Sequence, residues 1–179
     1  MEKIVLGGGC FWCIEAVYQM LDGVINVTSG YAGGADDQPN YYSVSSEKTG
    51  HAEVIEVEFD PQVLSLENVF AVFFTAHDPT TRNQQGADKG TQYRSVILYT
   101  TVEQKTAAEK FMKKLTEEKV YASPLVTELE PLQKFFPAED YHQNYYEQNK
   151  EVNPYCQVVI DPKIAKIRQS FAHLLKNKG

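Results

Sequence analysis

The spacing of apolar residues predicts a short strand and then a helix at the start of the chain. Residues 2–6 are an apolar run typical of a strand, and three glycines at residues 7–9 let the backbone turn sharply after it. The apolar positions that follow recur at helical spacing; they are Ile14, Val17, Tyr18 and Leu21. An Asp-Gly pair at residues 22–23 ends this pattern. Cys10 is therefore expected at, or just before, the first turn of a helix.

The middle of the chain predicts further strands and one more helix. Strands are predicted at residues 24–29, 51–59 and 93–99, and an apolar helix at residues 65–76. Polar stretches at 30–46 and 77–92 are predicted as long loops, and loops of that length are often functional. With the first strand and helix, the order of elements is β-α-β-β-α-β. This order predicts an α+β fold, the ferredoxin-like plait, in which two helices cover one face of an antiparallel sheet.

One predicted strand places a carboxyl group on the more apolar of its two faces. Within residues 51–59, Glu53 shares a face with Ile55, Val57 and Phe59. A carboxyl group in apolar surroundings is shifted toward its neutral, proton-donating form. A glutamate near a strand end can also turn to solvent. The pattern therefore leaves two interpretations of Glu53, a buried acid or an exposed charge.

The rest of the chain predicts elements added to this plait. They are an amphipathic helix at 103–120, an edge strand at 125–129, a helix at 137–150 and a last helix at 163–176. Asp161-Pro162 is typical of a helix start, and Asn153-Pro154 interrupts the preceding helix. No repeat or linker divides the sequence. We predict one catalytic domain over residues 1–179, with a core of about 1–130 and with C-terminal helices and a coil tail in 131–179.

Charge and cysteine content narrow the class of protein. The chain of 179 residues carries a net charge of −7 without a basic block, which argues against a nucleic-acid surface. No apolar run is long enough to span a bilayer, and the N-terminus lacks an apolar signal region. Three cysteines do not make the disulfide framework of a small secreted protein. We expect a cytoplasmic monomer that binds neither nucleic acid nor membranes.

Cys10 and Cys13 are the most reactive feature of the sequence. The start of a helix favours an anion, so Cys10 is expected to ionise more readily than a free cysteine. Cys13 lies one turn further on the same face, where the two sulfurs can meet. Competing interpretations are a phosphate cradle, half of a zinc site, and two cysteines packed as small hydrophobes. The glycines lack the Lys-Ser/Thr of a P-loop, and no second Cys-x-x-Cys or His-x-x-x-His pair completes a zinc site.

Several stretches in combination resemble one family, the A-type, S-epimer-specific peptide methionine sulfoxide reductases. They are Gly9-Cys10-Phe11-Trp12, Thr49-Gly50-His51-Ala52-Glu53, His77-Asp78-Pro79-Thr80 and residues 86–95, with support from residues 30–34 and Tyr141-His142-Gln143. The likeness extends from the first strand to Cys156. It implies reduction of methionine sulfoxide, free and in proteins, with thioredoxin as reductant and with no metal or other cofactor.

The resemblance also implies a role for each matching residue. Cys10 would attack the sulfoxide sulfur, and Phe11 and Trp12 would receive the methyl group of the substrate. Glu53 would donate a proton to the sulfoxide oxygen. That proton matters because a sulfoxide is a poor electrophile until its oxygen is protonated or strongly hydrogen-bonded.

Three further polar residues match the family. The hydroxyl groups of Tyr41 and Tyr93 would bind the sulfoxide oxygen, and Asp88 would help to hold the site together. The neighbouring Tyr42 is an alternative to Tyr41. We expect His51 and His77 to make structural hydrogen bonds, because the chemistry already has an acid.

The resetting step involves a second cysteine, and the sequence offers two. Attack by Cys10 leaves a sulfenic acid, which a second thiol converts to a disulfide that an external dithiol reduces. The sequence departs from the common family pattern, because Cys13 replaces a glycine and the glycine-rich tail after Cys156 is missing. We favour Cys156 over Cys13, because Pro154 is expected to keep its segment out of a helix and free to swing in.

Two other functions remain open on the sequence. The first is a thioredoxin-like dithiol-disulfide exchanger that uses Cys10 and Cys13, against which the β-α-β-β-α-β order and the inward Glu53 argue. The second is a metal-binding or redox-sensing module, which stoichiometric zinc in the purified protein would support.

Overall fold

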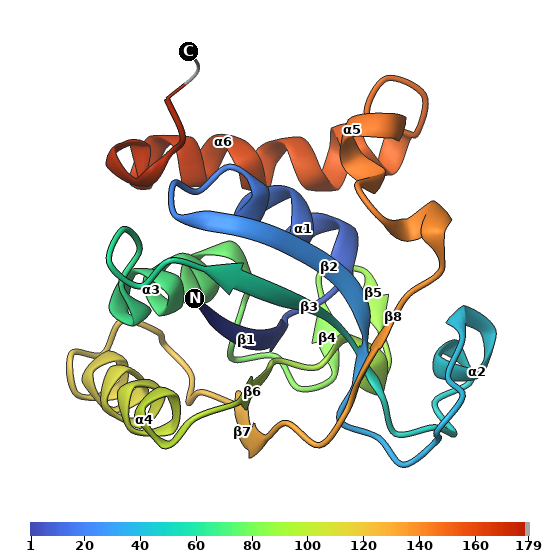
Figure 1. Ribbon diagram of the computed structural model, residues 1–179, viewed down its shortest axis with the longest axis horizontal. Helices are drawn as coiled ribbons and strands as arrows, with labels where there is room; N and C mark the ends of the chain where they lie inside the picture. The colour runs from blue at the N-terminus through green and yellow to red at the C-terminus, as the bar shows by residue number, and fades with distance from the viewer. Residues whose placement is uncertain (178–179) are drawn as a thin grey trace.

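One mixed sheet forms the centre of the structure. The computed structural model describes residues 1–177, and within that range six strands pair in the order β7-β6-β1-β3-β2-β8 (Figure 1). They are β1 (Glu2–Gly7), β2 (Val24–Ala32), β3 (Ala52–Phe59), β6 (Val96–Tyr99), β7 (Glu128–Pro131) and β8 (Phe135–Pro137). Neighbouring strands are antiparallel, except for β6 and β7, which are parallel. The four inner strands are those that the apolar pattern predicted, and β7 and β8 extend the two edges.

The central position of β1 follows from its apolar sequence. Ile4, Val5 and Leu6 are fully buried, which suits a strand covered on both faces. In the register with β3, Ile4 lies opposite Val57 and Leu6 opposite Ile55. The predicted strand at residues 2–6 is therefore confirmed, and it carries the chain directly into the turn before Cys10.

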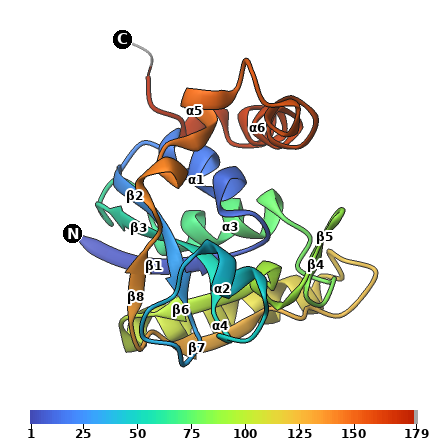
Figure 2. The same ribbon diagram turned by 90° about the vertical axis from the view of Figure 1, so that its right-hand side faces the viewer.

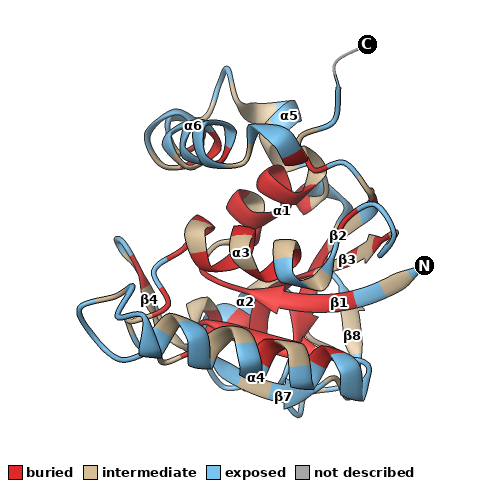
Figure 3. Cartoon of the chain, turned by 90° about the vertical axis from the view of Figure 1, so that its left-hand side faces the viewer, coloured by how far each residue is buried: buried red, intermediate tan, exposed pale blue. Residues whose placement is uncertain are grey.

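Helices cover one face of the sheet. These are α1 (Phe11–Gln19) and α3 (Leu66–Ala76), and Ala108 of α4 (Val102–Glu117) joins the same apolar core (Figures 1 and 2). The start of α3 is as predicted, because the Ser65 hydroxyl accepts a hydrogen bond from the Asn68 N–H at 3.2 Å. Figure 3 shows β1 and the neighbouring faces of α1 and α3 buried, whereas the outer side of α4 is exposed.

The loops between the strands contain short elements that the sequence pattern did not predict. β2 runs on to Ala32, and the next loop holds α2 (Tyr41–Ser45), whose N-cap Asn40 forms a capping box with Ser43. The second loop holds a small hairpin of β4 (Gln84–Gln85) and β5 (Asp88–Lys89). The predicted strand at 93–99 begins only at Val96, because Tyr93 belongs to the 3₁₀ turn η1 (Thr91–Tyr93).

The predicted helix at 137–150 is wrong over most of its length. This stretch begins in β8, passes through the 3₁₀ turn η2 (Asp140–His142), and is helical only in α5 (Tyr145–Asn149). The reason is pairing with a sheet edge, since β8 lies along β2 with Pro137 opposite Gly30. The Gln143 side chain then holds the chain on β2, because it accepts from the Ser29 N–H and donates to the Ser29 carbonyl, both at 2.9 Å. This tertiary pairing overrides the helical spacing of the tyrosines.

The last helix is also shifted from the prediction. α6 (Asp161–Ser170) ends at Ser170 rather than near residue 176, and a 3₁₀ turn η4 (Ala172–Leu174) follows. The chain then returns to the end of α1, where the Lys176 N–H donates to the Met20 carbonyl at 2.9 Å. α6 lies across α1 as an outer layer (Figure 1). Among residues 1–177, no helix is long and apolar enough to cross a membrane.

Candidate active site

A tight glycine turn places Cys10 at the start of α1. Gly9 has φ +92°, and a Cβ atom there would come within 2.8 Å of the Gln85 side chain. Cys10 is the N-cap residue, with extended dihedral angles of φ −60° and ψ 128°. The predicted position of Cys10 is confirmed. Cys10 lines a hollow beside the sheet.

The hollow has a cavity volume of about 130 Å³. It is comparable in size to apolar cavities that admit a benzene-sized molecule, roughly 150 Å³. Its lining comes from α1, α2, β3, β5, η1 and the C-terminal segment; the residues are Cys10, Phe11, Trp12, Tyr41, Glu53, Asp88, Tyr93 and Tyr155. The structure thus brings together the seven residues for which the resemblance implied a role in chemistry or substrate binding. Tyr155 is an addition that the sequence alone did not suggest.

Glu53 is the acidic group of the cavity. It is 2% exposed, in line with the inward face predicted for β3, and its Oε1 accepts a hydrogen bond from the Phe11 N–H at 3.2 Å. Burial raises the pKa of Glu53 to about 8, although the Phe11 N–H acts in the opposite direction. The nearby Asp88 raises it further. At neutral pH this carboxyl group is mainly protonated, as a proton donor must be.

The expectation that Cys10 ionises readily is wrong. Burial raises the pKa of Cys10 well above its usual value, and the neighbouring Cys13 and Glu53 raise it further. The Trp12 backbone N–H lowers the pKa, as a helix start should, but burial outweighs it. The pKa of Cys13 is instead lowered, because a hydrogen bond from the Cys10 thiol favours the thiolate form of Cys13. Of the two thiols, Cys13 is therefore the one whose pKa is lowered.

The aromatic wall depends on residues from the C-terminal segment. The Trp12 indole stacks on Tyr145, with ring centroids 3.7 Å apart and an interplanar angle of 4°. Its Nε1–H donates to Nδ1 of His142 at 3.0 Å, and burial lowers the pKa of His142. A neutral His142 therefore accepts from the indole. The Phe11 ring lies 5.0 Å from His142 and closes the same side of the cavity.

Sequence reasoning named the stretch that contains His142 but gave neither His142 nor Tyr145 a role. The helical spacing of the tyrosines placed Tyr145 on a longer predicted helix. Their contacts with Trp12 form only when the C-terminal segment folds back over α1, so no local pattern could assign them.

The two candidate tyrosines reach the cavity from different elements, α2 and η1. Tyr41 lies in the first turn of α2, and its backbone N–H donates to Glu139 Oε2 at 3.2 Å. Burial raises the pKa of both Tyr41 and Tyr93, and Glu53 raises both further. Both hydroxyl groups are therefore protonated donors at neutral pH. Tyr42, the alternative to Tyr41, is 81% exposed and does not line the cavity.

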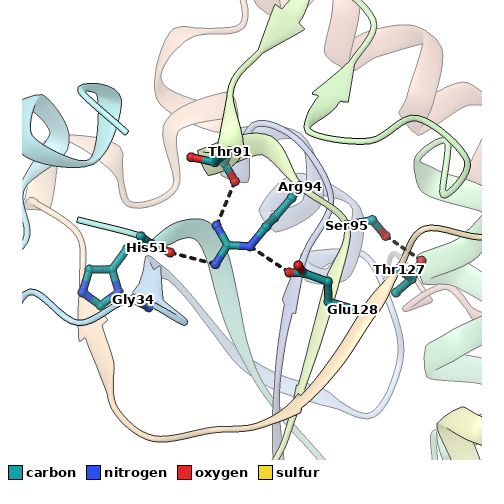
Figure 4. Close-up of polar contacts among 8 residues, drawn as sticks. Gly34, His51, Thr91, Arg94, Ser95, Thr127 and Glu128 are labelled. Atoms are coloured by element: carbon teal, nitrogen blue, oxygen red, sulfur yellow. Dashed lines mark hydrogen bonds and ion pairs between the residues drawn. The ribbon is translucent and has the colours of Figure 1, made fainter. Parts of the chain in front are cut away.

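An arginine holds the turn that carries Tyr93. Arg94 donates to the carbonyl groups of Thr91 and Gly50, each at 2.8 Å, and its Nε lies 2.9 Å from Glu128 Oε2 (Figure 4). These contacts connect η1 to the start of β3 and to β7. Asp88 is held differently, because its Oδ2 accepts from the Tyr155 hydroxyl at 2.8 Å.

The two histidines expected to be structural make structural contacts. Nδ1 of His51 accepts from the Gly34 N–H at 2.9 Å (both residues labelled in Figure 4), and Nε2 lies 2.6 Å from the Asp36 carbonyl. His77 is bonded to the Phe73 carbonyl and the Ser95 hydroxyl, and burial lowers its pKa to about 4. Neither ring lines the cavity.

The position of Cys156 corrects the reason for which it was favoured. Pro154 does not keep this segment out of a helix, because Cys156 begins the π-helical turn η3 (Cys156–Ile160), which continues into α6. Its side chain is fully buried and shares an apolar cluster with Cys13 on α1. All three cysteines are free thiols. Within residues 1–177, no group of three His, Cys, Asp or Glu side chains is arranged to hold a metal ion.

A thiol at a helix start, opposite a protonated carboxyl group in an aromatic cavity, defines a thiol-dependent oxidoreductase. The family model for peptide methionine sulfoxide reductases matches residues 2–175. The peptide methionine sulfoxide reductase MsrA of Chromobacterium violaceum is 51% identical over 177 residues, which is 99% of this chain and 100% of that protein. The MsrA of Saccharolobus solfataricus is 48% identical over 98% of each chain. The chain belongs to the peptide methionine sulfoxide reductase family, and it is an enzyme.

Solved structures agree with this assignment. The reduced form of Mxr1 from Saccharomyces cerevisiae aligns with a TM-score of 0.79 at 35% identity, over 85% of this chain and 87% of that one. Methionine sulfoxide reductase A of Corynebacterium diphtheriae gives a TM-score of 0.74 at 32% identity, over 83% and 75%. Mxr1 has also been solved in complex with Trx2, and that chain aligns with a TM-score of 0.57 at 27% identity, over 80% and 84%. Family membership favours the reductase over the dithiol exchanger and the metal module.

Proposed function

We propose that the chain reduces the S-epimer of methionine sulfoxide, free and in proteins, with Cys10 as nucleophile and Glu53 as proton donor. The observation that carries this proposal is the meeting of these two residues in one small cavity with Phe11 and Trp12. A methyl group fits against the two aromatic rings, the sulfur faces Cys10, and the oxygen faces Glu53. Three fixed contacts leave one direction for the rest of the side chain, and this is what selects one epimer.

The reaction begins with activation of the sulfoxide oxygen. Glu53 transfers its proton to that oxygen, and the hydroxyl groups of Tyr41 and Tyr93 donate hydrogen bonds to it. As Cys10 attacks the sulfur, its thiol proton passes toward Cys13, whose thiolate the Cys10 thiol already favours. The S–O bond of the substrate breaks as the hydroxyl group moves to the Cys10 sulfur, the transient bond between the two sulfurs breaks, and methionine leaves with its electron pair, so that Cys10 remains as a sulfenic acid. Asp88 and Tyr155 hold the rim of the cavity.

The second half of the cycle restores the thiol. Either Cys13 or Cys156 condenses with the sulfenic acid, which releases water and forms an intramolecular disulfide. We propose thioredoxin as the external reductant, supported by the solved complex of the relative Mxr1 with Trx2. Three free cysteines suit a reducing compartment, so we propose a cytoplasmic location. We also propose that the chain acts as a monomer.

The strand order also supports a finer description of the fold. The inner strands run β6-β1-β3-β2, all antiparallel, and α1 and α3 connect β1 to β2 and β3 to β6. We propose that this core is the split-βαβ, ferredoxin-like plait, extended by β7 and β8.

An epimer-resolved assay tests the proposed function. The reduced enzyme is mixed with each separated epimer of dabsyl-methionine sulfoxide, and the methionine product is measured by chromatography. We expect product from the S-epimer alone and none from Cys10→Ser, with Cys156→Ser retaining the first turnover as the matched thiol control. Equal turnover of the R-epimer, or an active Cys10→Ser variant, would contradict the proposal.

A further inference from the structure

The helix that carries Tyr41 is short and has one buried residue. α2 (Tyr41–Ser45) stands apart from α1, α3 and α4 in Figure 1, and only Val44 of its five residues is buried. A helix of this length is not stable by itself, so contacts with other segments decide where it lies. The position of the Tyr41 hydroxyl group, which the proposed mechanism places at the sulfoxide oxygen, therefore depends on what holds α2.

The carboxylate group of Glu139 connects α2 to the sheet. Its Oε2 atom accepts a hydrogen bond from the Tyr41 N–H at 3.2 Å, and its Oε1 atom accepts from the Tyr31 hydroxyl group at 2.9 Å. Tyr31 lies on β2, is fully buried and pairs with Phe136 of β8. The Tyr41 N–H is among the first N–H groups of α2, which have no acceptor within the helix. One side chain thus supplies that acceptor and joins it to a buried residue of the sheet.

The backbone of Glu139 is itself fixed on both sides. The N–H of the preceding residue, Ala138, donates to the Ser29 carbonyl at 2.8 Å. The carbonyl of Glu139 accepts from the His142 N–H at 2.9 Å. Glu139 therefore reaches α2 from a segment that is already attached to the edge of the sheet.

Glu139 is charged at neutral pH although it is partly buried. Burial acts to raise its pKa, but its own backbone N–H, the Tyr31 hydroxyl group and the Tyr41 N–H together lower the pKa. A charged acceptor forms stronger hydrogen bonds than a neutral one. The Tyr141 hydroxyl group also donates to Oε2, at 3.3 Å. Glu139 does not line the cavity, so it acts on the reaction only through the groups that it holds.

We propose that Glu139 is a positioning residue for the reduction: it fixes the start of α2 to Tyr31 and thereby holds the Tyr41 hydroxyl group at the sulfoxide oxygen. This inference rests on the proposed function, in which Tyr41 donates to that oxygen. The hydroxyl group is at the far end of the Tyr41 side chain, so a small tilt of α2 displaces it. Catalytic groups must be held to within about 0.5 Å, and a displacement of about 1 Å can lower a rate by roughly 10²-fold.

The experiment places Glu139→Ala in two backgrounds, because Tyr41 and Tyr93 share the oxygen and either can partly cover the loss of the other. In Tyr93→Phe, Tyr41 is the remaining donor of the two, and Glu139→Ala should lower the single-turnover rate of methionine formation by at least about 10-fold. In Tyr41→Phe, Glu139 has no hydroxyl group left to position, and the same change should alter the rate by less than about 2-fold. Both rates are measured with saturating S-epimer of dabsyl-methionine sulfoxide.

Milder variants keep the test informative if Glu139→Ala disturbs folding, which thermal unfolding reveals. Glu139→Gln keeps an acceptor oxygen and should lose less than about 3-fold in the Tyr93→Phe background. Tyr31→Phe keeps the ring but removes the hydroxyl group that orients the carboxylate, and it should slow the Tyr93→Phe enzyme by about 3-fold. Asp140→Ala removes the neighbouring, exposed carboxylate and should leave every rate unchanged, as the control for loss of charge.

Equal losses from Glu139→Ala in the two backgrounds would overturn the proposal, because a general loosening of the fold slows both enzymes alike. An unchanged rate in Tyr93→Phe would also overturn it. If Tyr41→Phe does not slow the Tyr93→Phe enzyme, Tyr41 is not a donor and Glu139 has nothing to position. Failure of the proposed function gives a separate result, because the unmodified enzyme would then form no methionine from the S-epimer.

Discussion

Glu53 and Glu15 are both buried carboxyl groups, and the structure surrounds them differently. Glu53 is 2% exposed, faces the cavity and accepts one backbone hydrogen bond. Glu15 is 1% exposed, lies in α1 and accepts a hydrogen bond from the Ser29 hydroxyl at 2.6 Å. The backbone N–H groups of Asn144 and Tyr145 also favour its charged form. Burial raises the pKa of both groups, but at Glu15 three donors oppose the rise.

The comparison teaches that burial alone does not make a proton donor. The number of donors around the carboxyl group separates an acid that gives up a proton from one that organises the backbone. Glu15 connects α1 to β2 and to the turn before α5. Because Tyr145 of that turn stacks on Trp12, the second carboxyl group supports the aromatic wall of the first site.

The largest effect is expected from removing the acid. Glu53→Gln keeps the shape and the contact with Phe11 but cannot donate the proton, so the rate of the first chemical step should fall by about 10²–10⁴-fold. Single-turnover measurement of methionine formation checks this. Thermal unfolding should show the fold intact. If the rate of the first chemical step falls by less than about 5-fold, another group protonates the sulfoxide oxygen.

The pH dependence of Glu53 gives the next effect. Its pKa of about 8 in the folded protein lies above the ordinary value of 4.5, so the folded state holds this proton more tightly than the unfolded state. The contribution to stability is complete below pH 4.5 and is lost as the pH rises through about 8, by an amount on the order of a few kcal/mol. Between pH 5 and 9 the free energy of unfolding of the unmodified enzyme, measured with denaturant, should fall relative to that of Glu53→Gln, because only the glutamate ionises. The rate of the first step should fall above pH 8 in the unmodified enzyme alone.

Removing Glu15 should affect stability and substrate binding more than the chemical step, in contrast to the removal of Glu53. Glu15→Ala leaves the Ser29 hydroxyl and two backbone N–H groups without their acceptor, so the free energy of unfolding should fall by about 1–3 kcal/mol. Activity should fall through a higher KM as Trp12 loses its support, with kcat changed less. Glu15→Gln keeps an acceptor and should restore most of both. Equal damage from Glu15→Gln would show that charge, rather than hydrogen bonding, matters at this junction.

The smallest expected effect comes from the partner of Glu15. Ser29→Ala removes one of its donors and should cost about 1 kcal/mol of unfolding free energy. Because the remaining N–H groups still face the carboxylate, KM should be unchanged within about 2-fold. Denaturant unfolding and steady-state kinetics check both values. Thr28→Ala, on the same strand without a contact to Glu15, serves as the control.

Local sequence patterns accounted for the core of the site. The apolar run of β1, the glycine turn and the helical stripe of α1 placed Cys10 correctly, because each depends on neighbouring residues. The alternation of β3 placed Glu53 on the more apolar face for the same reason but left open whether its carboxyl group is buried. The ionisation of Cys10 was predicted wrongly from local structure, because it depends on burial by the whole molecule.

The C-terminal segment marks the limit of local reasoning. Helical spacing of the tyrosines predicted one helix at 137–150, but this stretch pairs with the edge of β2 and then crosses α1. Trp12 contacts His142 and Tyr145, which lie 130 or more positions further along the chain. Helical and strand periodicity relates only residues a few positions apart, so it cannot predict these contacts. The same holds for Cys156, which the structure places against Cys13 in a helical turn.

The sequence by itself determined the place of Cys10 at a helix start, the strand that carries Glu53 and the order of the core elements, since short-range periodicity and glycine conformations encode them. Only the tertiary structure decided which groups are desolvated and which side chains from distant segments meet. The tertiary structure thereby raised the pKa of Glu53, lowered that of Cys13 and fixed the position of Trp12, because pKa values and aromatic contacts depend on the complete surroundings of a group rather than on its neighbours in the chain.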